Sequence, residues 1–165
     1  MRTHWGFGVV MLGLCAGVAF ADEFNPPPMK DGLWETHSVS TQAGKNTSEI
    51  TIKMCQTKEL TQSSQAMSQE LRKRNECIST VVQRSGNTTV VESRCAKGNN
   101  AGQVVRISYS ITGDTALRME MHQQKGGAEQ TTVVDSKYLS SCPAGMKGGE
   151  MIMPDGKVVG GGGTP

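Results

Sequence analysis

Apolar and polar residues alternate along most of this chain, and a period of two is typical of a strand with one buried face. In 104–111, for example, Ile107 and Tyr109 alternate with Ser108 and Ser110. The same alternation predicts seven strands, at 33–40, 49–56, 77–84, 88–95, 104–111, 116–123 and 130–138.

Short turn sequences separate these segments at regular intervals. Ser85-Gly86-Asn87, Gly113-Asp114 and Gly126-Gly127 each lie between two predicted strands, which is the pattern of consecutive hairpins. We therefore expect a mainly β (α+β) fold, with a single curved antiparallel meander sheet or half-barrel of six to eight strands.

One segment, 58–74, does not alternate, and it predicts the one α-helix inserted between the second and third strands. Thr57 is a suitable N-cap, and the basic residues 72–74 suit the negative end of the helix dipole. Leu60, Met67 and Leu71 form only a thin apolar stripe, so we expect the helix to lie on the sheet rather than inside a core.

The first 21 residues have the pattern of a secretory signal peptide. A positive start is followed by an apolar run at 6–18 and by Ala19-Phe20-Ala21, which has small residues at the two positions read by signal peptidase. The sequence therefore predicts a periplasmic or secreted protein that does not span a membrane after cleavage. The predicted divisions are a signal peptide at 1–21, an extended Pro-rich lead-in at 22–30, one domain at 31–149 and a flexible Gly-rich tail at 150–165.

Four cysteines remain after this leader, and an even number in an exported chain predicts two disulfides. Cys77 and Cys95 are equidistant from the predicted turn at 85–87, so they face each other across the hairpin. Cys55 would then pair with Cys142, although a Cys55–Cys77 bridge around the helix remains an alternative. Their spacing includes no C-x-x-C pair and does not suit a zinc site.

Composition excludes several classes of function. The formal net charge is +2 and no aromatic residues accompany the basic triplet, so we expect no nucleic-acid partner. After the leader only His37 and His122 remain as histidines, and no hydrolase, zinc-protease, P-loop or dinucleotide motif is present. The sequence thus predicts a non-enzymatic protein without a cofactor.

Methionine is unusually frequent, with ten in the chain. Two Met-x-Met pairs have a spacing that can hold Cu(I) through thioether sulfurs. The alternative is that methionines on one strand face fill the core of an aromatic-poor domain. The candidate copper ligands are Met119, Met121, His122, Met151 and Met153.

Three sequence motifs resemble those of small exported bacterial proteins of the domain of unknown function 3617 family. They are PMKDGLWE at 28–35, CQTKE at 55–59 and CPAGMKGG at 142–149. The resemblance implies a periplasmic or secreted domain with a mainly antiparallel sheet, and it implies no activity.

Trp34, within the first motif, has two interpretations. It is either a large anchor in the core or, together with Tyr109, part of the lining of a ligand groove. A strongly curved sheet has a concave face that can hold an apolar molecule. The hypothesis favoured by the sequence is a periplasmic binding or accessory domain for a small apolar ligand or an envelope protein, and the alternative is a periplasmic Cu(I)-binding protein.

Overall fold

The computed structural model describes residues 27–99, 101–125 and 127–160. The predicted signal peptide and the first part of the predicted lead-in, 22–26, lie outside these residues. Residues 27–30 of the lead-in are described, and they precede the first strand without regular secondary structure.

The described residues form nine strands and one helix. The elements, in chain order, are β1 (Gly32–Gln42), β2 (Lys45–Gln56), α1 (Lys58–Arg74), β3 (Cys77–Ser85), β4 (Thr88–Cys95), β5 (Val104–Thr112), β6 (Ala116–Lys125), β7 (Ala128–Ser140), β8 (Met151–Ile152) and β9 (Val158–Val159).

All nine strands belong to one antiparallel sheet of order β3-β4-β5-β6-β7-β1-β2-β8-β9. Strands β3 to β7 form a meander of consecutive hairpins, and β1 of the β1–β2 hairpin pairs with β7 at its end. The sheet is open, with β3 and β9 as its edges, so the expectation of a mainly β half-barrel is confirmed.

The sheet has more strands than the six to eight expected, because β8 and β9 form a short hairpin within the segment 150–165. Met151 and Ile152 of β8 pair with Met54 and Lys53 of β2. Two-residue strands beside a Gly-rich end carry too little alternation to be recognised in the sequence. The predicted tail therefore begins with residues that extend the sheet.

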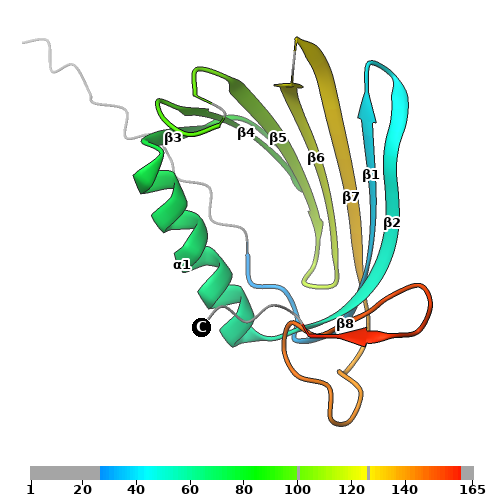
Figure 1. Ribbon diagram of the computed structural model, residues 1–165. Coiled ribbons are helices and arrows are strands. Elements are labelled where there is room, and N and C mark those ends of the chain that lie inside the picture. The colour runs from blue at the N-terminus through cyan, green and yellow to red at the C-terminus, as the bar shows by residue number, and fades with distance from the viewer. Residues whose placement is uncertain (1–26, 100, 126, 161–165) are drawn as a thin grey trace, which may run out of the picture.

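The sheet is strongly curved, and α1 lies across its concave side, from the end of β2 to the start of β3 (Figure 1). Cross-strand partners share a face, so the pairing registers show which side chains point toward the helix. One row, for example, runs from Ile111 through Leu117, Ser136 and Thr36 to Ile52. The large apolar members of this concave face are Trp34, Ile50, Ile52, Met54, Val81, Val91, Val105, Ile107, Tyr109, Ile111, Leu117, Met119, Met121, Val134 and Tyr138.

The convex face is charged, in contrast. Arg118 Nη1 lies 2.7 Å from Asp135 Oδ2, and Lys137 Nζ lies 2.8 Å from Glu35 Oε1. The lysine hydrogen bond also lowers the pKa of the Glu35 carboxyl. Charged residues thus gather on the convex face, although the buried Leu33, Cys55 and Val90 also lie on that side.

Gly32 begins β1 at a position that requires glycine. Its φ is +146°, and an added Cβ would lie 2.4 Å from the backbone oxygen of Ser140 and 2.5 Å from Cε2 of Tyr138. Replacement of Gly32 by alanine is expected to lower the free energy of unfolding by about 2–3 kcal/mol. Urea denaturation measures this loss. Gly44→Ala is the matched control, because Gly44 also has positive φ but no atom within 4 Å of its Cβ position. An equal loss in both variants would show that the close approach at Gly32 is unimportant.

Candidate ligand groove

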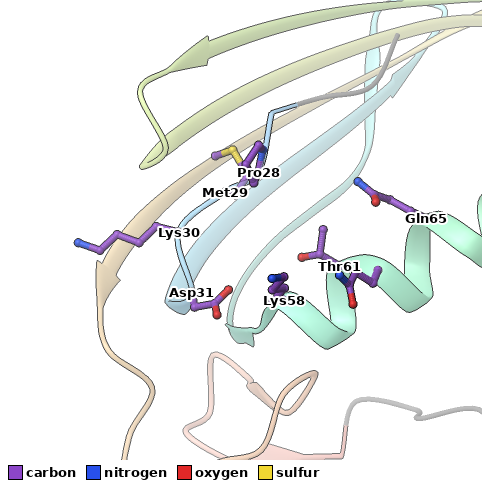
Figure 2. A pocket seen from close by; sticks show the side chains of 8 residues that line it. Pro28, Met29, Lys30, Asp31, Lys58, Thr61 and Gln65 are labelled. Carbon is purple, nitrogen blue, oxygen red and sulfur yellow. The ribbon is translucent and has the colours of Figure 1, made fainter. Parts of the chain in front are cut away.

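Two adjoining cavities lie between the concave face, the residues before β1 and the first turns of α1. The inner cavity has a volume of about 160 Å³, and the outer one of about 580 Å³. Met29 and Thr61 line both cavities, so the two adjoin, and together they are called the groove below. The inner cavity is lined by Met29, Trp34, Thr36, Met54, Gln56, Thr61, Leu117 and Ser136. The outer cavity, drawn in Figure 2, is lined by Pro28, Met29, Lys30, Asp31, Lys58, Thr61, Gln62 and Gln65.

Trp34 holds one wall of the groove in place. Its indole is 4% exposed, and its Nε1 donates a hydrogen bond of 2.8 Å to the backbone oxygen of Lys30. The ring also packs edge-on against Tyr138, with a centroid separation of 6.0 Å. The Lys30 ammonium lies 4.3 Å from the centroid of the Tyr138 ring, in cation–π contact. Trp34 thus ties residues 28–30 to the sheet while it lines the inner cavity.

The opposite wall is α1, which begins as the sequence predicts. The Oγ1 of Thr57 accepts a hydrogen bond of 3.3 Å from the backbone N–H of Leu60. None of the 17 helical residues is buried, however, and the apolar Met67 and Leu71 are 53% and 45% exposed.

The helix side chains that line the groove are therefore polar or charged. Thr61 and Gln65 are half-buried there. Lys58 is exposed and lines only the outer cavity, which is the mouth of the groove. A helix on a sheet normally buries its apolar stripe. Here no apolar side chain of α1 lines the groove. The groove is the space between the polar side of the helix and the apolar concave face.

Tyr109 lies on the concave face, as does Trp34, but it does not line either cavity. Burial raises the pKa of its hydroxyl above the ordinary value of 10.0, and the nearby Arg72 opposes this shift. Tyr109 therefore lies under the C-terminal half of α1, whereas the cavities lie under its first turns. The structure places the two aromatic residues on one face without bringing them into one pocket.

The candidate copper ligands are spread over the sheet. Met119 and Met121 share the concave face, whereas His122 is on the convex face, between Glu120 and Glu129. Met151 is in β8 and Met153 just beyond it, and four steps in the strand order separate β6 from β8, about 19 Å along the sheet. The five residues are thus not brought into one site. Across the described part of the chain, no group of three or more His, Cys, Asp or Glu residues is arranged to hold a metal.

Several groove residues were not singled out from the sequence, among them Met29, Met54, Thr61, Leu117 and Ser136. The alternation places Met54 and Leu117 on the apolar faces of their strands. It does not show that the two strands contribute to one pocket, because β1 and β7 separate β2 from β6 in the sheet. Only the pairing of β1 with β7 brings these side chains together.

The sulfurs of Cys77 and Cys95, and those of Cys55 and Cys142, lie at disulfide distance. These are the pairings that the hairpin register favoured, and Cys77 faces Cys95 directly in the β3–β4 ladder. Cys55 is 1% exposed and its partner Cys142 is half-buried, whereas Cys77 and Cys95 are both half-buried. Cys77 also lines a surface cavity of about 400 Å³ together with Arg72, Lys73 and Glu76. The two disulfides therefore differ in access to solvent.

This difference predicts the order of reduction. A thiolate attacks a disulfide with two accessible sulfurs faster than one with a buried sulfur. With limiting dithiothreitol, Cys77–Cys95 is expected to open before Cys55–Cys142. Alkylation followed by peptide mass spectrometry measures which cysteines are modified first. Simultaneous modification of all four cysteines would contradict the prediction.

A comparison with family models supports the family that the sequence resembles. A model of the family described as Protein of unknown function (DUF3617) matches residues 29–142. The chain belongs to the DUF3617 family. The DUF3617 match begins at the groove residue Met29 and ends at Cys142. It includes both disulfides and every groove residue except Pro28, and it leaves out β8 and β9. No curated protein and no solved structure matches the chain. Among the described residues, no helix is long and apolar enough to cross a membrane.

Proposed function

We propose that this DUF3617 protein is an exported, non-enzymatic binding protein that holds a small apolar molecule in the groove between α1 and the concave face. The observation that carries the proposal is the uncovered apolar surface. Leu117, Met54 and Trp34 line a cavity whose helix side is contributed by the polar Thr61. Apolar pockets with a few polar groups are typical of small-molecule sites.

Export is supported by two features. The leader pattern at 1–21 has the signal-peptide order of charge, apolar run and small residues. The two disulfides are of the kind that form and persist in an oxidising compartment. An apolar molecule in that compartment needs shelter from water, which a groove with an apolar floor supplies.

The proposal is tested by filling the inner cavity. Ser136 lines it, and its hydroxyl lies 2.9 Å from the hydroxyl of Thr36 on the neighbouring strand. Ser136→Phe is expected to lower the affinity for an uncharged apolar fluorescent probe, such as N-phenyl-1-naphthylamine, about tenfold, because the phenyl ring occupies the cavity. Fluorescence titration of the purified protein measures this affinity.

Ser110→Phe is the matched control. Ser110 makes the same cross-strand contact, 2.9 Å from the hydroxyl of Thr88, but on the convex face. This variant loses an equivalent hydrogen bond and gains the same ring outside the groove, so its probe affinity is expected to remain unchanged. If both variants bind as the wild type does, or if the wild type binds no apolar probe, the proposed function is wrong.

A further inference from the structure

We propose that the ligand is an amphiphile with one acyl chain and a zwitterionic headgroup. Its chain runs along the groove so that only the chain end enters the inner cavity, and its head lies between Asp31 and Lys58. This inference rests on the proposed function and adds the chemical class of the ligand. It follows from the difference between the two parts of the groove. Trp34, Met54 and Leu117 line the inner part, whereas charged and amide side chains line much of the outer part.

The two charges at the mouth come from opposite walls of the outer cavity. Figure 2 shows Asp31 on the segment that leads into β1 and Lys58 on the first turn of α1. Within the described residues, neither side chain has an ion-pair partner within 4.0 Å, and the two do not pair with each other. An anionic group beside Lys58 and an ammonium beside Asp31 would pair with both charges at once.

Lys30, the third charged residue of the outer lining, is occupied elsewhere. Its ammonium lies over the ring of Tyr138, and Figure 2 shows its side chain extending away from α1. The charges left for a headgroup are therefore one carboxylate and one ammonium. A purely anionic head would meet repulsion from Asp31, and a neutral head would leave both charges without an ionic partner.

Gln62 and Gln65 complete the outer lining. Their amides can both donate and accept hydrogen bonds, so they suit the ester and hydroxyl groups that join a charged head to an acyl chain. Thr61 makes two hydrogen bonds within the protein, accepting from Gln56 Nε2 at 2.6 Å and donating to the backbone oxygen of Thr57 at 3.1 Å. It is thus a fixed point where the polar mouth meets the apolar interior.

The test compares three probes that share one acyl chain: palmitoyl lysophosphatidylethanolamine, palmitate and monopalmitoylglycerol. Their dissociation constants are measured by displacement of the bound fluorescent probe from the full-length protein, below the critical micelle concentrations. The lysophospholipid is expected to bind about tenfold more tightly than either of the others. Phosphoethanolamine, which is the head without a chain, is expected to displace no probe.

Variants of the mouth identify the groups responsible. Asp31→Asn and Lys58→Gln are each expected to weaken lysophospholipid binding about three- to fivefold and to leave monopalmitoylglycerol binding unchanged. The double exchange Asp31→Lys with Lys58→Asp is expected to restore the affinity for the lysophospholipid, because the zwitterionic head can bind in the reverse orientation. Lys45→Gln is the control, because Lys45 is an exposed lysine at the start of β2 that lines neither cavity, and this variant is expected to bind as the wild type does.

The outcomes separate this inference from the proposed function. Equal affinity for the three acyl probes, or tightest binding of palmitate, would overturn the zwitterionic head while an apolar ligand site remains. Displacement by phosphoethanolamine alone would overturn the amphiphile. Failure of every acyl probe and of the fluorescent probe would remove both proposals.

Discussion

Removal of the Cys55–Cys142 disulfide, by replacing both cysteines with alanine, is expected to lower the free energy of unfolding by about 4–5 kcal/mol. The bridge closes a loop with a sequence separation of 87, so without it the unfolded chain gains much conformational freedom. Since small domains are stable by about 5–15 kcal/mol in total, this loss is a large fraction of the stability.

The bridge also supports the segment that carries β8. Next to it, the backbone N–H of Cys55 donates to the oxygen of Glu150 at 3.0 Å, and the N–H of Gly149 donates to the oxygen of Cys55 at 2.7 Å. These bonds and the β2–β8 pairing attach residues 149–152 to the sheet. We expect amide hydrogen exchange in this segment to become faster in the variant lacking the bridge.

The matched control is the double alanine variant of Cys77 and Cys95. That disulfide has a sequence separation of only 18, and its removal is expected to cost about 3 kcal/mol in the same chain-entropy model. Urea denaturation followed by far-ultraviolet circular dichroism measures both losses. If the second variant loses as much stability as the first, loop length is not what distinguishes the two bridges.

Replacement of Trp34 by alanine is expected to lower the free energy of unfolding by about 3–5 kcal/mol. The indole is nearly completely buried, packs against Tyr138 and donates its N–H to the backbone of Lys30. Truncation leaves a void beside the inner cavity and releases residues 28–30 from the sheet. Because only five residues form the buried apolar core of the described chain, little else compensates for the loss.

Trp34→Phe separates the hydrogen bond from the packing. It keeps a ring against Tyr138 but has no donor for the Lys30 oxygen, so it is expected to lose only about 1–2 kcal/mol. Circular dichroism in urea is the measurement for both variants, because it does not depend on indole fluorescence. A loss in Trp34→Ala below that of Trp34→Phe would show that Trp34 is a groove residue without an anchoring role.

Much of the fold follows from local pattern. The alternation in 104–111 and the turn at 85–87 determine strands and hairpins whose partners are neighbours in the sequence, and β3 to β7 pair in that order. The Cys77–Cys95 pairing follows from the same local register. The antiparallel contact between β1 and β7 joins segments about 100 residues apart, as between Thr36 and Ser136, and no local signal specifies it.

The candidate groove depends on that long-range contact. The size of Trp34 and its place in the first motif already made it a candidate groove residue in the sequence. Met29, Met54 and Leu117 become groove residues only because β1 lies between β2 and β7. The thin stripe of α1 indicated a helix lying on the sheet. Which side of the helix faces the sheet depends on the packing of the whole domain, and the structure has Met67 and Leu71 exposed.

The sequence by itself determined that this chain forms an antiparallel sheet with one apolar and one polar face, because a period of two assigns every side chain to a face. It also determined the Cys77–Cys95 disulfide, because that pairing depends only on the equal sequence distance of the two cysteines from the turn at 85–87. Only the tertiary structure decided that the helix on the concave face presents polar side chains to it. The physical reason is that curvature, strand order and helix orientation arise from packing among segments far apart in the chain, and the groove exists only where they meet.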